Sequence, residues 1–379
     1  MMNEMMAKID RLQSPTLWAD PKHVNIFIFG TGGPYDICII AEGGAFWGRI
    51  DLKKDDVRYY TQQLQQRFSD VLLENDLLVR HPDQSEENLL ALVEISREAF
   101  DKIFGDPSVA AGMMALLTTS PLHIEITSDE FSIPWEMLYT RTVYEPLSYE
   151  HFWGMNHIIS RTARRTTRVE PIISYSARPT VGFLSNDTLR FERTERDFFI
   201  ALDDQNSIDL IMLRALDNTP AQKTQEFKYL KTFWNNELNL AQIVCHARAG
   251  SDERIFLELT REFPVKHSDL KTYEILINNS PLVVLNACGT GNLNPQYASN
   301  FPKAFLEQGA LGVVATECIV PDSFASEFTK ALYERLFSGM PLGECLLETR
   351  LHFLNTYNNP AALLYSMYAP SSTRLVKTD

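Results

Sequence analysis

The sequence predicts an α/β fold with a mostly parallel central sheet. Largely apolar runs at 240–244 and 282–285 are typical of parallel strands that are covered on both faces. Strand-like and helix-like segments alternate through the second half of the chain, as the right-handed crossovers of a parallel sheet require. With 379 residues, 45% of them hydrophobic, the chain can form one or two units around a sizeable core.

The first half of the chain is predicted to form a smaller lobe. A strand meander, two helices and a further strand are expected over residues 24–52, 56–73, 86–104 and 122–127. Pro134 can begin a short helix, because its missing N–H would have no partner in a first turn. We expect Trp135 to pack in the core of this lobe and Glu136 to pair with a basic group such as Arg161.

The second half is predicted to begin near Arg178. Strands are expected over 179–185, 208–216, 240–246, 255–260 and 281–288, and helices over 191–202, 219–236, 268–277 and 323–337. In open α/β sheets, reactive groups collect beyond the carboxyl ends of parallel strands. The residues that end these strands are therefore the first candidates for a functional site.

Two of the predicted parallel strands end on residues that can react. Cys288 ends one strand and His246 ends another, and the chain between them is long enough for a crossover that makes the strands neighbours. A thiol and an imidazole in one cleft form the dyad that nucleophilic catalysis needs. The structural alternative is that both are buried core residues. That is the role we assign to the remaining cysteines, Cys38, Cys245, Cys318 and Cys345.

The segments around these residues resemble a known family. The stretch 283–291, Val-Val-Leu-Asn-Ala-Cys-Gly-Thr-Gly, is similar to the nucleophile strand of the CHAT-domain peptidases, caspase-like cysteine proteases related to separase. Further similarity lies in the stretches 132–139, 151–161, 301–316, 319–322, 323–337, 340–355 and 358–370. The resemblance implies a caspase-like three-layer fold. A peptidase lobe, 178–379, would follow an N-terminal extension, 1–20, and a non-catalytic pseudo-caspase-like lobe, 21–177.

The resemblance also implies a function. Cys288 would be the nucleophile and His246 the base of an endopeptidase that cleaves specific protein targets and depends on a protein or small-molecule activator. The backbone amides of Cys288 and Ala247 would form the oxyanion hole. Such peptidases often serve bacterial antiviral defence or programmed cell death. This chain departs from the family pattern at Ala247, where Gly is usual after the His, and at Cys318, where Trp is common.

Substrate preference depends on acidic residues near the predicted cleft. Asp322 follows the next core strand and could hold a basic side chain before the scissile bond, and Glu317 is the other acidic candidate. Asp322 could equally cap the helix that begins near Ser323. A pocket built with Cys318 and Ile319 would instead favour Leu or Met.

Charge and residue spacing exclude several ligand classes. The formal net charge of −14 argues against nucleic acid as the main partner, since phosphate binding needs a dense basic face. The one basic cluster, Arg161 to Arg168, is expected to be a solvated linker or a site for an acidic partner. The 8 His show no metal-ligand spacing and no glycine-rich phosphate loop is present, so we predict neither metal nor cofactor.

Cellular location and function class follow from the remaining features. No stretch approaches about 18 uninterrupted apolar residues, so no membrane span is predicted. The 5 cysteines lack paired spacing and a thiolate nucleophile needs a reducing compartment, which predicts a cytoplasmic protein. The Met-rich start of the chain could form a short amphipathic helix. Three functions stay open: a cysteine endopeptidase, a catalytically silent binding or assembly module, and an acyl or amide transferase that uses the same dyad.

Overall fold

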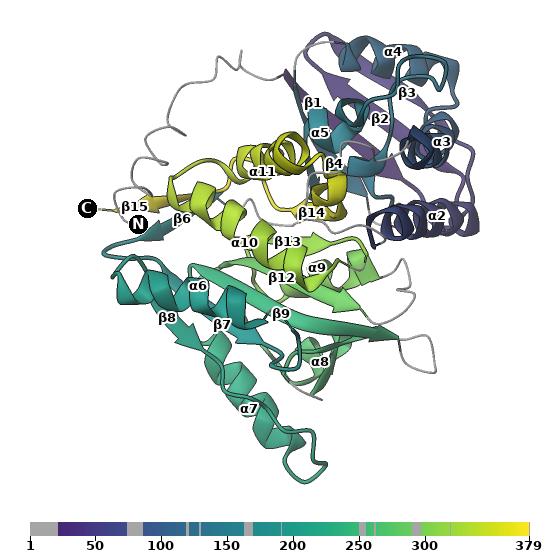
Figure 1. Cartoon of the computed structure of the whole chain (residues 1–379). Helices are drawn as coiled ribbons and strands as arrows, with labels where there is room; N and C mark the ends of the chain where they lie inside the picture. Colours follow the sequence, from purple (N-terminus) through teal and green to yellow (C-terminus); the bar gives the residue numbers. More distant parts are fainter. Residues whose placement is uncertain are drawn as a thin grey trace.

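The computed structural model contains two large β-sheets and a two-stranded ribbon (Figure 1). It describes residues 22–73, 86–118, 121–128, 130–162, 170–190, 192–249, 255–260, 263–289, 297–318 and 320–378. Three expectations fall outside these residues: the helix within the 1–20 extension, the part of the basic cluster after Thr162, and the pocket residue Ile319.

The first sheet has five strands in the order β3-β2-β1-β4-β5. They are β1 (Lys22–Phe29), β2 (Tyr35–Ala41), β3 (Gly44–Ile50), β4 (Leu122–Ser128) and β5 (Ile158–Thr162). The antiparallel pairing of β1 with β2 and of β2 with β3 confirms the predicted meander. β4 then pairs in parallel with both β1 and β5, so the meander continues into a parallel half.

Three helices pack against this sheet: α2 (Lys54–Leu73), α3 (Glu86–Ile103) and α4 (Pro107–Leu117). The first two confirm the predicted helices. The third was missed, because its eleven residues carry no charge and therefore show no polar face. Gly48 on β3 allows α4 to approach closely, since a Cβ at that position would lie 2.3 Å from Cγ2 of Val109.

The second sheet has a row of five parallel strands, with antiparallel strands added beyond β13 and beside the end of β9. Its strands are β7 (Thr180–Ser185), β8 (Asp209–Met212), β9 (Leu240–Ala249), β10 (Ile255–Glu258), β11 (Pro264–Lys266), β12 (Leu282–Gly289), β13 (Gly312–Thr316) and β14 (Tyr365–Tyr368). β8, β7, β9, β12 and β13 follow one another in parallel. β14 pairs antiparallel with β13, and β10 and β11 form an antiparallel extension beside the end of β9.

Helices cover both faces of the second sheet and make three layers (Figure 1). They are α6 (Glu192–Asp204), α7 (Lys223–Trp234), α8 (His267–Thr272), α9 (Tyr297–Glu307), α10 (Asp322–Phe337) and α11 (Leu342–Tyr357). Val284 on β12 joins the core under α6, α10 and α11, whereas its neighbours Val283 and Leu285 join the core under α7, α8 and α9. This alternation confirms the predicted three-layer α/β architecture.

Two helices, α7 and α8, differ from their predicted bounds by four or more residues at one end. α7 begins at Lys223 rather than Thr219, because the amides of Gln222 and Lys223 both bond to the Thr219 carbonyl in a preceding turn. α8 stops at Thr272 rather than Ile277. Glu274 has a φ of 52° and the Ile275 amide bonds back to the Leu270 carbonyl, the closing pattern of a Schellman motif.

The two lobes share one hydrophobic core. β5 of the first sheet contacts β14 of the second, and α11 packs on both β5 and α5 (Trp153–Asn156). The short strand β6 (Ile172–Tyr175) pairs in parallel with β15 (Arg374–Lys377) near the end of the chain. The predicted boundary near residue 178 stays a prediction, and contacts across it are extensive.

Candidate active site

The register of β9 and β12 places the two predicted dyad positions opposite each other. The strands pair in parallel from Leu240 with Leu282 through to His246 with Cys288. Neighbouring strands lie about 4.8 Å apart, so the two backbones bring these positions to the same carboxyl edge at one strand spacing. The crossover inferred from the sequence is therefore present, while the catalytic pairing itself stays a prediction.

The His246 ring contacts a loop that follows β7. Nε2 of His246 lies 3.0 Å from Oγ1 of Thr188. Thr188 donates its amide and its hydroxyl to Oδ1 of Asn186, at 3.1 and 2.7 Å. Asn186 is fully buried, and its Nδ2 donates to the Glu258 carbonyl on β10 at 2.9 Å. Neither residue was predicted from the sequence, where the only signal was a Ser-Asn-Asp-Thr turn after a strand.

Ala247 lies inside β9 rather than in a loop. It is opposite Leu257 on β10 and opposite Gly289 on β12. Its side chain is buried, and Ala247 is not one of the described residues with positive φ. Alanine in place of the usual glycine therefore causes no backbone strain. The predicted use of its amide in an oxyanion hole stays a prediction, and the strand pairing on both sides gives that backbone a structural role as well.

Asp322 contacts the same loop as His246 does. Its Oδ2 accepts a hydrogen bond from the Arg190 amide at 3.2 Å. The alternative role as a helix cap is wrong, because α10 starts at Asp322 itself and the cap residue is Pro321, with no side-chain cap bond. A five-residue loop, 186–190, thus touches both the predicted base and the predicted pocket carboxylate. This proximity was not visible in the sequence.

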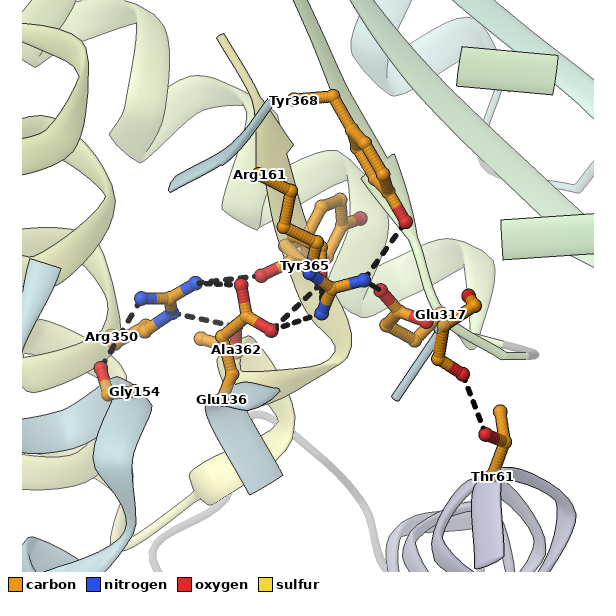
Figure 2. A network of polar contacts seen from close by, with 11 residues as sticks. Thr61, Glu136, Gly154, Arg161, Glu317, Arg350, Ala362, Tyr365 and Tyr368 are labelled. Carbon is orange, nitrogen blue, oxygen red and sulfur yellow. Dashed lines mark hydrogen bonds and ion pairs between the residues drawn. The ribbon is translucent and has the colours of Figure 1, made fainter. Parts of the chain in front are cut away.

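Glu317 lies in a buried network of charges (Figure 2). Its carboxylate forms an ion pair with Arg161, which also pairs with Glu136, and the predicted Glu136–Arg161 contact is thereby confirmed. Burial would lower the pKa of Arg161, but the carboxylates of Glu136 and Glu317 outweigh it and raise that pKa. The substrate-pocket role of Glu317 stays a prediction, and its ion pair provides a structural reason for a buried acid here.

Arg350 completes this network from α11. Its guanidinium donates to the carbonyls of Gly154, Tyr365 and Ala362 at 3.2, 2.7 and 3.4 Å, and lies 3.7 Å from Oε1 of Glu136 (Figure 2). Burial lowers the pKa of Arg350 to about 10, so the group stays charged at neutral pH. The network joins both lobes, and its member Glu317 directly follows the strand β13.

Asn286 has a structural role on the strand β12. It is fully buried two positions before Cys288, and its Nδ2 donates to Thr329 at 2.7 Å and to Glu195 at 3.1 Å. Tyr365 donates its hydroxyl to Oδ1 of Asn286 at 3.0 Å. Burial raises the pKa of Glu195 to about 8, although the hydrogen bonds that its carboxyl group accepts from Thr329, Asn286 and Gln242 lower it. The strand that carries Cys288 is thus fixed from beneath by a buried acid that sequence analysis did not identify.

The described residues offer neither a metal cluster nor a membrane-spanning helix. Within the described ranges, no group of three or more His, Cys, Asp and Glu side chains could hold a metal ion. None of the helices in that part of the chain is long and apolar enough to cross a bilayer.

Comparison with protein families decides where the chain belongs. The family model of the CHAT domain matches residues 93–369, which include the whole second sheet and the strands β4 and β5 of the first. This chain belongs to the CHAT domain family. The CHAT match and the three-layer arrangement of the second sheet between its helices together confirm the caspase-like fold that the resemblance implied.

Individual relatives of this CHAT chain are distant or partial. A protein named probable protease from Vitiosangium sp. (strain GDMCC 1.1324) is 33% identical over 149 residues, 36% of this chain and 19% of that protein. Two crystal structures of the Saccharomyces cerevisiae separase–securin complex match with TM-scores of 0.47 and 0.49 at 11% and 10% identity. The two matches cover 97% and 93% of this chain, and 31% and 30% of the respective matched chains in the separase–securin structures. The Drosophila initiator caspase Dronc matches with a TM-score of 0.33 at 9% identity, over 53% of this chain and 85% of that chain.

The CHAT chain therefore spans about a fifth of the curated relative and about a third of the separase chains that it matches. The family match and the similarity to a probable protease support a protease-like role.

Proposed function

We propose that this CHAT chain is a regulated cysteine endopeptidase in which Cys288 attacks the peptide and His246 transfers the proton. The observation that carries the proposal is the register of β9 and β12, which sets His246 opposite Cys288 at the carboxyl edge of a parallel sheet. Reactive groups collect at this edge in open α/β sheets. The family to which the chain belongs makes peptide hydrolysis the favoured chemistry for such a pair.

The proposed reaction begins with formation of the thiolate. A free thiol with a pKa of ~8.5 is only partly ionised at neutral pH, so the His246 ring accepts its proton. The sulfur then forms a bond to the scissile carbonyl carbon, and the C–N bond breaks as His246 returns the proton to the leaving amine. Water attacks the thioester with His246 as base, which releases the carboxylic acid and restores the thiol.

Negative charge develops on the carbonyl oxygen during each attack. The backbone amides of Cys288 and Ala247 are the proposed donors, and the loss of one such donor costs ~3 kcal/mol of transition-state stabilisation. For Ala247, this role requires its amide to point into the site at the last residue pair of β9 with β12, which Ala247 forms with Gly289.

Asp322 supports a preference for a basic residue before the scissile bond. Asp322 is half-buried, and its carboxylate contacts the loop that also touches His246. A pocket beside the reacting carbonyl would lie at this place. A buried Cys318 with a neighbouring apolar residue supports the competing preference for Leu or Met. Glu317 has a weaker claim, because Arg161 already engages its carboxylate.

The cellular role proposed for the enzyme rests on the family resemblance. We place the enzyme in the cytoplasm, acting on specific protein targets under the control of a protein or small-molecule activator. Bacterial antiviral defence or programmed cell death is the proposed context.

The test is a comparison of new protein N-termini in cells that express the wild-type chain or Cys288→Ala, together with the neighbouring genes. Termini that require Cys288 and His246 would establish proteolysis, and the residue before each cut would identify the pocket. A trapped thioester without peptide cleavage would instead indicate an acyl or amide transferase. If neither product forms and His246→Ala matches the wild type with the activator present, the chain is a silent assembly module.

A further inference from the structure

The orientation of the Asn186 side chain is fixed by its two neighbours. The Thr188 amide can only donate and the Glu258 carbonyl can only accept, and Asn186 lies between them at 3.1 and 2.9 Å. Its Oδ1 must therefore face Thr188 and its Nδ2 must face β10. This assignment depends on groups whose donor or acceptor character is unambiguous.

The fixed amide determines the direction of the Thr188 hydroxyl. Oγ1 lies 2.7 Å from Oδ1 of Asn186 and 3.0 Å from Nε2 of His246. A hydroxyl has one hydrogen, and an amide oxygen can only accept, so that hydrogen points to Asn186. Oγ1 then presents a lone pair to the imidazole, and Nε2 of His246 must carry the ring hydrogen.

The loop that presents Thr188 is anchored to the strands around the site. The Asn186 amide donates to the Val244 carbonyl on β9 at 2.8 Å, and the Leu189 amide closes the turn onto the Asn186 carbonyl at 3.2 Å. The Arg190 amide bonds to Asp322. Asn186 is fully buried, whereas Thr188 is exposed, so the buried amide fixes an exposed hydroxyl from beneath.

We propose that Thr188, held by Asn186, is a positioning residue that keeps His246 in the Nε2–H tautomer and makes Nδ1 the basic nitrogen of the ring. The Nε2–H bond to Thr188 persists whether the ring is neutral or protonated, so proton uptake at Nδ1 requires no rearrangement. The assignment supplies the orienting group that the sequence did not reveal. Its catalytic meaning rests on the proposed function, but the tautomer itself does not.

The test measures the tautomer directly. ¹⁵N chemical shifts of the His246 ring are recorded on the full chain at a pH where the ring is neutral, with His246→Asn to assign the signals. The wild type should show the Nε2–H form alone. Thr188→Val keeps the shape of the side chain but lacks the hydroxyl and should populate both tautomers, and Thr188→Ser should restore the single form.

A second readout follows the thiol without needing a substrate. The rate at which iodoacetamide alkylates Cys288 is measured by mass spectrometry between pH 5 and 9. We expect Thr188→Val to slow alkylation about tenfold near neutral pH, the effect of one lost hydrogen bond of ordinary strength, and Thr188→Ser to recover the rate. Thr232→Val is the matched control, because the hydroxyl of this exposed threonine donates to the Lys228 carbonyl within its own helix.

The outcomes separate the two proposals. An Nδ1–H ring in the wild type, or an unchanged tautomer in Thr188→Val, overturns the positioning role. If Thr188→Val does not fold, the wild-type tautomer alone decides the question. A confirmed Nε2–H tautomer with no cleavage in cells would retain the positioning role and remove the endopeptidase.

Discussion

Replacing Glu195 by glutamine should remove a large pH dependence from the stability of this protein. Glu195 lies fully buried on α6, where Gln242, Asn286 and Thr329 all donate to its carboxyl group. Burial nevertheless dominates and raises its pKa from 4.5 to about 8, so the folded protein holds a neutral acid at neutral pH. Glutamine has the same shape and can keep Oε1 as the acceptor of these three bonds.

The sign and size of the effect follow from proton linkage. Between pH 4.5 and 8 the unfolded chain releases the Glu195 proton while the folded chain keeps it, so the free energy of unfolding falls as pH rises. At about 1.4 kcal/mol per pH unit, the total over this range is about 5 kcal/mol as an upper limit. The stability is fully present below pH 4.5, and the loss is complete above pH 8.

Urea denaturation, monitored by Trp fluorescence at one-unit steps from pH 5 to 8, would measure this change in the free energy of unfolding. The Glu195→Gln protein should gain stability relative to the wild type at each step, because every other titrating group cancels in the comparison. Glu125→Gln on β4, an exposed position, is the matched control and should follow the wild type. Parallel wild-type and Glu195→Gln curves would show that the acid is ionised in the folded protein and would refute the reasoning.

Three further predictions concern the first lobe. Glu136→Gln leaves two buried guanidiniums without their shared partner and should cost about 3–5 kcal/mol in urea denaturation, whereas a loss below 1 kcal/mol would contradict the ion-pair role. Gly48→Ala places a Cβ against α4 and should cost about 1–3 kcal/mol, while Gly43→Ala, which meets no atom within 4 Å, should be neutral in the same thermal melts. Burial lowers the pKa of His157 to about 4, so the free energy of unfolding should fall as pH falls from 6.5 to 4. The His157→Asn protein should lose this part of the pH dependence of its stability.

The backbone of the site could be predicted because burial controls it. Largely apolar runs on two strands identify them as central and parallel, and such strands must end at one edge of the sheet. The sequence therefore predicted that His246 and Cys288 end neighbouring strands, and the register confirms that placement. The Glu136–Arg161 pair could be anticipated for a related reason, since a buried charge needs a partner.

The orienting loop could not be predicted, because its contacts join residues far apart in the chain. Asn186 and Thr188 read locally as a turn, and nothing near them indicates a bond to Glu258 or His246. Asp322 was ambiguous for a different reason. The helix α10 begins one residue earlier than expected, which moves Asp322 from the cap position into the first turn and directs its carboxylate to the loop.

Arg161 has a consequence for how this protein is made. It lies on β5 in the first lobe, yet of its four side-chain partners in the described part of the chain, three come from the second lobe: Glu317, Ser366 and Tyr368. A ribosome completes β5 long before it has synthesised those partners. Until they emerge, Arg161 has Glu136 as its acidic partner but lacks Glu317. Its strand β5 forms the edge of the first sheet and also lacks the contact with β14. Stable folding of the first lobe is thereby tied to synthesis of the last residues, and a chain truncated before Tyr365 should not accumulate as a folded half.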